Sequence, residues 1–225
     1  MCRKVVASRS SHYVFSLKLA DLYLKREERS QLYLGKLRRI TPTDYILYDA
    51  YGDGAHHRLS ELLAVHYNIK TRPAPTGVRG CEVGISNIFN NTETADTETS
   101  GGGRPHVLLQ DNFSRVRAAG KQNELLSNKV YVMNERTSKY DPLSSCLVDF
   151  KGRANVASVK NFQVVKSTPQ DSTTPQAPDS EKDWLLQMGK TTEDCFNMDF
   201  KQPLSLLQAF AVCITRFDMS LSFSS

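Results

Sequence analysis

Apolar residues dominate one long segment near the end of the chain. Between Lys201 and Arg216 the sequence carries no charged side chain, and apolar residues recur on every side at helical spacing. This pattern is typical of a helix that is buried all round. A helix that crosses a bilayer needs about 20 apolar residues, and this segment is shorter. The pattern therefore predicts a helix near 203–216 that is enclosed by strands of the same protein.

Shorter segments alternate between apolar and polar residues, as half-buried strands do. They are rich in β-branched or aromatic residues and are bounded by Gly, Pro, Ser or Asp. These predicted strands lie at 32–37, 130–133, 146–150, 157–165 and 184–188. A short charged helix or extended turn is expected at 20–31, ahead of the first of them.

Two stretches lack apolar residues that could pack in a core. Residues 90–104 and 167–182 are rich in Ser, Thr, Pro, Gly and acids, so we expect disordered loops there. The length of 225 residues and the 40% hydrophobic content are typical of one globular domain over residues 1–225. The two loops are therefore interpreted as insertions within that domain.

Several segments together carry a resemblance that covers nearly the whole chain. They are FKGRANVASVKNFQVV at 150–165, QMG at 187–189, EDCFNMDF at 193–200, PLSLLQAFA at 203–211, SHYVFS at 11–16, YLGKLRR at 33–39, YILYDAYGDG at 45–54 and SELLAVHYN at 60–68. In content and order they resemble the C-terminal domain of the tubby family. The resemblance implies a mainly β fold with α: a closed antiparallel β-barrel of about a dozen strands around a hydrophobic C-terminal helix.

The segment that precedes SHYVFS is short compared with the family pattern. Residues 1–10 can supply at most one edge strand, at 4–8. We therefore expect a barrel that is incomplete at its N-terminus, with unpaired backbone groups at a sheet edge.

Charge is distributed unevenly along the chain. Residues 1–80 carry 14 Lys and Arg against 7 Asp and Glu, whereas the remaining 145 residues carry 15 against 17. A basic first third favours an anionic partner, either phosphoinositide headgroups or nucleic acid. The five widely spaced cysteines favour reduced thiols, as in the cytoplasm.

The resemblance implies a binding site for phosphatidylinositol 4,5-bisphosphate at Lys36 and Arg38. Side chains at i and i+2 of a strand share a face, so both cations can reach one ligand while Leu37 faces the core. Arg39 is expected to point away from this site.

Two further positions correspond to the family's pocket. His12 stands where the family has Asn, and Arg58 lies one residue from Leu59, which aligns with a family Arg. In a loop Arg58 can reach the site, whereas on a regular strand it faces the opposite side.

Other chemistry is not indicated. His56, His57 and His66 lack partners at the spacing of a tetrahedral metal site, and no nucleophile elbow occurs. We therefore expect no enzymatic activity, no metal and no cofactor. Gly152, Arg153 and the Lys160 to Phe162 segment are interpreted as building the sheet.

These observations predict a protein that docks peripherally on the cytoplasmic leaflet of the plasma membrane. The resemblance further implies an adaptor in membrane or ciliary cargo trafficking, with transport machinery and membrane cargo as partners and the cilium as a location. The alternative is a nuclear or nucleic-acid-binding regulatory factor, which the basic first third also permits.

Overall fold

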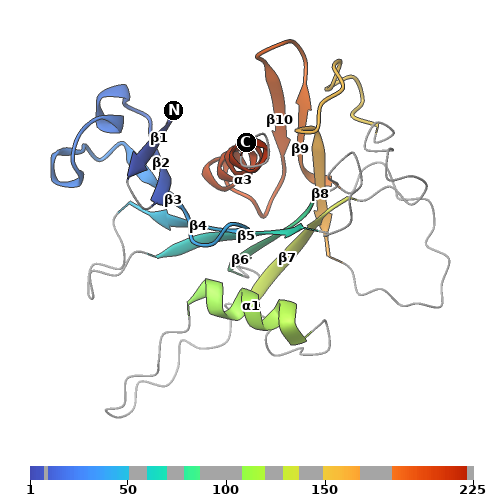
Figure 1. Cartoon of the computed structure of the whole chain (residues 1–225), viewed down its shortest axis with the longest axis horizontal. Helices are drawn as coiled ribbons and strands as arrows, with labels where there is room; N and C mark the ends of the chain where they lie inside the picture. Colours follow the sequence, from blue (N-terminus) through green and yellow to red (C-terminus); the bar gives the residue numbers. More distant parts are fainter. Residues whose placement is uncertain are drawn as a thin grey trace. The chain divides into compact units, whose positions relative to one another are not determined.

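The computed structural model describes residues 1–7, 10–50, 60–69, 79–86, 108–119, 129–136, 149–167 and 184–221. Within these ranges ten strands form one sheet in the order β1 to β10, which is also their order along the chain (Figure 1). The strands are β1 Cys2–Ala7, β2 Ser10–Ser16, β3 Tyr33–Arg39, β4 Asp44–Asp49, β5 Glu61–Ile69, β6 Arg79–Ser86, β7 Val130–Glu135, β8 Phe162–Lys166, β9 Trp184–Lys190 and β10 Phe196–Phe200. The helices are α1 Leu109–Ala119 and α3 Leu206–Leu221, with 3-10 turns η1 Leu19–Leu22 and η2 Arg26–Glu28.

The mainly β architecture with a helix near the C-terminus is confirmed. Neighbouring strands are antiparallel in the β1–β2, β2–β3, β7–β8, β8–β9 and β9–β10 pairs. In the described part of the chain, β1 and β10 are the two end strands of the order. The expected closed barrel of a dozen strands is therefore not confirmed.

The predicted strands agree with the structure where residues alternate most regularly. β3, β7 and β9 contain nearly all of 32–37, 130–133 and 184–188, and β1 contains most of the predicted edge strand at 4–8. The predicted turn at 20–31 contains η2 and all of η1 except its first residue, Leu19. Of the predicted strand 146–150, only Asp149 and Phe150 are described, and neither is in a strand. The predicted loop 90–104 lies outside the described residues, as does the predicted loop 167–182 except for Ser167.

The predicted strand 157–165 begins later than expected. β8 starts at Phe162, because the preceding segment bonds to β9 without pairing as a strand. The amides of Asn155 and Val156 donate to the Lys190 carbonyl, at 2.9 and 3.1 Å. Asn161 Oδ1 in turn accepts from the Lys190 amide at 2.8 Å. The Asn161 side chain therefore accepts the hydrogen bond that the backbone of a neighbouring strand would otherwise accept from Lys190.

The chain divides into two compact units, each built from separate stretches of sequence. The first comprises Met1–Arg38, Ile46–Ala64 and Gly84–Val132, and the second comprises Arg39–Tyr45, Val65–Val83 and Met133–Ser225. Each unit is described by itself below.

In the first unit α1 covers an apolar cluster. Its buried members are Ile46, Ala64, Leu109, Phe113 and Val130. The Phe113 ring lies so close to Gly84 of β6 that a Cβ there would meet ring carbons at under 3 Å. A glycine is therefore required for this helix to approach the strand.

In the second unit α3 begins later than predicted and is not buried all round. Ser205 Oγ accepts from the Gln208 amide at 3.3 Å, and Gln208 Oε1 accepts from the Ser205 amide at 2.9 Å, which forms a capping box. The helix therefore starts at Leu206 and not near Pro203. Its fully buried residues are Leu204 just before it and Ala209, Ala211, Val212, Cys213, Thr215 and Asp218 within it. Phe210 is only half-buried and Leu206 is exposed, so the prediction of complete enclosure is wrong.

Polar side chains attach α3 to strands of the second unit. Tyr67 and Thr215 share a hydrogen bond of 2.9 Å, and the Tyr45 hydroxyl donates to Asp218 at 2.8 Å. Arg216 forms a bidentate ion pair with Glu135, in which its two terminal guanidinium nitrogens donate to the carboxylate oxygens at 2.8 and 3.1 Å. Each of these α3 side chains thereby has a polar partner on a strand far away in sequence.

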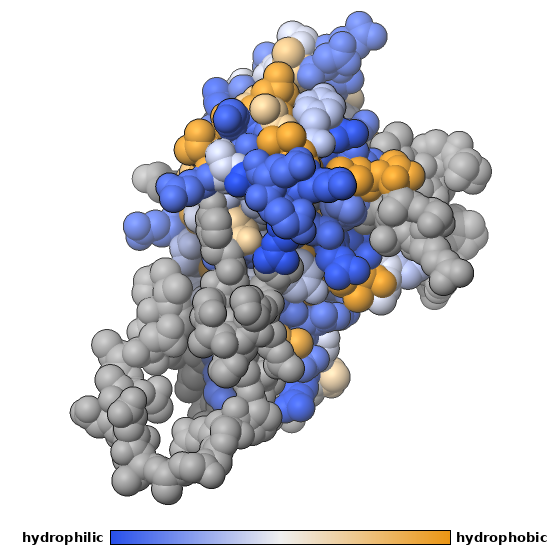
Figure 2. Space-filling model, turned by 90° about the vertical axis from the view of Figure 1, so that its left-hand side faces the viewer, coloured by the Kyte–Doolittle hydropathy of each residue, from blue (hydrophilic) through white to orange (hydrophobic). Residues whose placement is uncertain are grey.

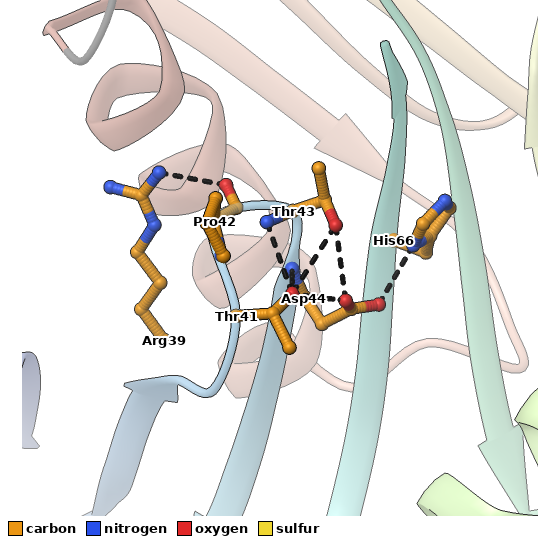
Figure 3. A network of polar contacts seen from close by, with 6 residues as sticks. All are labelled: Arg39, Thr41, Pro42, Thr43, Asp44 and His66. Carbon is orange, nitrogen blue, oxygen red and sulfur yellow. Dashed lines mark hydrogen bonds and ion pairs between the residues drawn. The ribbon is translucent and has the colours of Figure 1, made fainter.

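A polar network fixes the turn between β3 and β4 (Figure 3). Thr41 Oγ1 accepts from the amides of Thr43 and Asp44 at 3.2 and 3.0 Å, and it donates to the Asp44 carboxylate. His66 on β5 donates to the same carboxylate at 2.7 Å. Burial acts to raise the pKa of Asp44, but the hydrogen bonds from Thr41 and His66 outweigh it and lower the pKa. The turn is therefore anchored by a carboxylate that stays ionised.

A row of polar side chains crosses β8, β9 and β10. Gln187 is paired with Gln163 on one side and Asp199 on the other. Gln163 donates to Gln187 at 3.0 Å, and Gln187 donates to Asp199 at 2.9 Å. Arg153 completes the row with two bonds to Asp199, at 2.8 and 2.7 Å. The prediction that Arg153 belongs to the framework of the sheet is thus confirmed.

Candidate anion-binding site

Strands β2 and β3 bring the predicted site residues onto one face. Their register pairs His12 with Arg38 and Val14 with Lys36. Leu37 between the two cations is fully buried, whereas Lys36 is half-buried and Arg38 is exposed. Directly paired residues of antiparallel strands lie on the same face. His12, Lys36 and Arg38 therefore share the face opposite Leu37, and for Lys36 and Arg38 this is what their spacing predicted.

A glycine immediately before Lys36 allows β3 to lie close to β4. A Cβ at Gly35 would collide with the backbone oxygen of Tyr48. Only glycine lacks this atom, so the sequence Gly35-Lys36 couples the close approach of two strands to the placement of the lysine.

Burial, together with repulsion among cations, lowers the pKa values of the basic groups on this face. Burial lowers the pKa of Lys36, and the guanidinium groups of Arg38, Arg29 and Arg26 lower it further. Burial likewise lowers the pKa of His12, with Lys36, Arg38 and Arg29 acting in the same direction. His12 is therefore predominantly neutral at pH 7.

Within the described residues, neither Lys36 nor Arg38 forms an ion pair with an acidic side chain. We refer to Arg26, Arg29, Lys36 and Arg38, together with the mostly neutral imidazole of His12, as the cationic cluster. Its four charged members repel one another until an anion is present.

Arg26 and Arg29 were not identified as site residues from the sequence. Arg29 is held by a bond of 3.1 Å from its Nε to the Leu24 carbonyl and by stacking of its guanidinium 4.4 Å from the centre of the Tyr33 ring. Arg26 begins η2 and is exposed. The only sequence signal was the KREER run at 25–29, which is equally typical of a solvated turn.

The remaining predicted residues fall elsewhere. Arg58 lies outside the described residues, so its role stays a prediction. Arg39 donates to the Pro42 carbonyl at 2.7 Å, and its guanidinium lies 3.7 Å from the Asp218 carboxylate. These contacts give Arg39 a structural role in the second unit.

The cationic cluster has the composition of a phosphate site. Arg38 can form two parallel charge-assisted hydrogen bonds with a phosphate, and Lys36 supplies a mobile point charge. Among the described residues no group of His, Cys, Asp and Glu is arranged to hold a metal ion. His66 bonds to Asp44, whereas His56 and His57 lie outside the described ranges. Neither α1 nor α3 is long and apolar enough to cross a membrane.

The fold and the cluster together define a mainly β protein with a C-terminal helix and a cationic face on a β-hairpin. Comparison with known families gives a match to the Tub family over residues 1–219. The chain therefore belongs to the Tub family.

Curated relatives agree with this assignment. Tubby-like F-box protein 11 of Oryza sativa subsp. japonica is 28% identical over 254 residues, which cover 98% of this chain and 60% of the relative. Protein king tubby 1 of Aedes aegypti is 29% identical over 229 residues, covering 98% of this chain and 48% of the relative. Protein king tubby 2 of Culex quinquefasciatus is 30% identical over 224 residues, covering 98% of this chain and 46% of the relative. The chain thus spans about half the length of these relatives.

Proposed function

We propose that the chain is a non-enzymatic domain that binds phosphatidylinositol 4,5-bisphosphate through the cationic cluster. The observation that carries this proposal is the charge of the cluster, which no described carboxylate neutralises at Lys36 or Arg38. Half-buried cations that repel one another are stabilised by a ligand with several negative charges. A bisphosphate headgroup supplies such charges within the span of two strands.

Binding of the headgroup docks the chain on the cytoplasmic leaflet of the plasma membrane. Anionic lipids concentrate there and attract basic surfaces by about 1 kcal/mol per Lys or Arg near the membrane. The specific contacts of Lys36 and Arg38 add to this diffuse attraction. We further propose a cellular role as an adaptor for membrane cargo, including cargo delivered to cilia, which the resemblance to the tubby family implies.

Co-sedimentation with liposomes tests the site. Each of Lys36→Ala and Arg38→Ala removes a charge-assisted contact worth about 1.5–3 kcal/mol, so each should weaken binding to vesicles with the bisphosphate lipid roughly ten- to a hundredfold. Arg115→Ala is the matched control, because it removes one exposed cation from α1 in a helix that tolerates alanine. We expect the control to stay within about twofold of the parent chain.

Equal losses for all three variants would show that diffuse attraction, and no site, explains the binding. Duplex DNA at the same salt concentration provides the second arm, since phosphate-backbone binding depends steeply on salt. Tighter binding to DNA than to the lipid would favour the nucleic-acid alternative and overturn the proposal.

A further inference from the structure

The segment between β2 and β3, residues 17–32, is shaped by a buried carboxylate. Asp21 of η1 is fully buried. It accepts hydrogen bonds from Ser16 Oγ at 2.8 Å, from Ser30 Oγ at 2.7 Å and from the Ser30 amide at 3.1 Å. Leu22 beside it turns inward and packs with Val14. The segment is thus a preorganised loop.

The outer surface of this loop carries large apolar side chains. Leu17, Leu19 and Tyr23 are 61%, 59% and 67% exposed, and Leu32 is 46% exposed. The Leu17 amide donates to the Leu32 carbonyl at 3.0 Å, which places these two leucines next to each other at the end of the hairpin. Single exposed leucines are common on proteins, but here four exposed apolar side chains gather on one short loop that the bonds of Asp21 hold in place.

Cations are interspersed among these apolar side chains. Lys18, Lys25 and Arg26 are exposed on the same segment. Arg3 donates to the Leu22 carbonyl at 2.9 Å, and its guanidinium lies 4.3 Å from the centre of the Tyr23 ring. Figure 2 views the side of the chain that carries β1 and the loop, and hydrophobic residues there are mixed with hydrophilic ones. This mixture is typical of segments that lie at the boundary between headgroups and acyl chains.

We infer that the outer side chains of residues 17–32 insert into the interfacial region of an anionic bilayer, next to the headgroup held by the cationic cluster. The inference rests on the proposed function, which it extends from headgroup recognition to contact with the interfacial region of the bilayer. A lipid surface is favoured over a protein partner because the loop contributes Arg26 and Arg29 to the cationic cluster, which is the proposed site for the lipid headgroup.

The dimensions agree with a shared membrane surface. Leu32 precedes Lys36 by four residues, which is about 13 Å along an extended strand. Interfacial apolar groups reach about 5–10 Å into the headgroup and acyl boundary. A headgroup bound at Lys36 and a leucine at position 32 are therefore close enough to contact one bilayer at the same time.

Two kinds of variant test the insertion. The triple change Leu17→Ser, Leu19→Ser and Leu32→Ser should weaken binding to vesicles with the bisphosphate lipid by roughly fivefold per leucine, on the order of a hundredfold together. It should leave the affinity for soluble inositol 1,4,5-trisphosphate, measured by calorimetry, unchanged. Leu206→Ser is the matched control, because Leu206 on α3 is 61% exposed, the same as Leu17, and lies outside the loop.

A direct measurement uses tryptophan fluorescence. Lipids brominated in the upper acyl chain should quench the fluorescence of the Leu19→Trp variant. The fluorescence of the Leu206→Trp variant should be quenched no more than that of the parent chain, which has one tryptophan. Quenching of both variants alike, or of neither, overturns the inference. So does a triple variant that keeps full vesicle affinity or that loses affinity for the soluble headgroup.

The two proposals can fail separately. If the parent chain does not bind the soluble headgroup but Leu19→Trp is quenched on phosphatidylserine vesicles, the insertion stands and the headgroup site is wrong. If the headgroup binds and Leu19→Trp is not quenched, the headgroup site stands and the insertion is wrong; capture of the loop by a protein would then have to explain its exposed leucines.

Discussion

Replacement of Arg216 by methionine should destabilise the chain in a pH-dependent way. The side chains of Arg216 and Glu135 are each only 12% exposed, and two hydrogen bonds join them. Glu135 also accepts from the Cys81 amide at 3.0 Å. Methionine keeps much of the volume of the arginine stem but removes its charge, so it leaves a buried carboxylate without its counter-ion.

The magnitude follows from this burial. Removal of one partner of a buried ion pair costs about 3–5 kcal/mol. This is a large part of the roughly 5–15 kcal/mol by which native proteins are stable. Burial already raises the pKa of Glu135, and loss of the arginine should raise it further. A carboxyl group whose pKa is higher in the folded state stabilises the fold at low pH, and this contribution is lost as pH rises through the folded pKa.

Urea unfolding followed by the fluorescence of Trp184 measures the effect. The penalty of Arg216→Met should be smaller near pH 5 than near pH 8, by about 1.4 kcal/mol for each unit by which the pKa of Glu135 rises. The double variant Glu135→Leu with Arg216→Met should recover much of the loss, because no buried charge remains. An equal penalty at both pH values, or a double variant no more stable than the single one, would refute the reasoning.

Two further predictions concern the hairpin that carries the cationic cluster. His12→Asn should lose more lipid affinity relative to the parent chain at about pH 5.5 than at about pH 7.5, because the lowered pKa of His12 rises again when a phosphate binds; a ratio of dissociation constants that does not change with pH would contradict this. Gly35→Ala should lower the melting temperature by about 5–10 °C, since its Cβ collides with the Tyr48 carbonyl. Gly80→Ala, where a Cβ meets nothing within 4 Å, should melt like the parent, and equal melting of both variants would show that the close approach of β3 and β4 is unimportant.

The part of the site that was predictable from sequence is the part set by strand periodicity. Lys36 and Arg38 flank a buried Leu37 because a strand alternates its faces, and this alternation is visible in the order of residues. Arg26 and Arg29 reach the same cluster only because two short 3-10 turns fold back around Asp21. A local pattern of charges does not encode that fold.

The C-terminal helix shows a similar division. Its apolar content predicted a helix, and the Ser205 to Gln208 capping box, which is readable in the sequence, marks its start better than Pro203 does. Arg216 and Asp218 are buried because Glu135 and Tyr45 lie opposite them in the fold. Apolar periodicity cannot show such partners, since they come from strands far away in sequence.

The polar row across β8, β9 and β10 sets a rule for how this part of the protein can vary. A shift of β9 by one residue would turn Gln187 to the other face and break its bonds to both Gln163 and Asp199. The row therefore stabilises one register of the three strands and destabilises registers that are shifted by one residue. Replacing one residue of the row by an apolar residue leaves the polar groups on either side without hydrogen-bond partners. Replacing all residues of the row together does not. Among relatives we therefore expect substitutions at these positions to occur together or not at all.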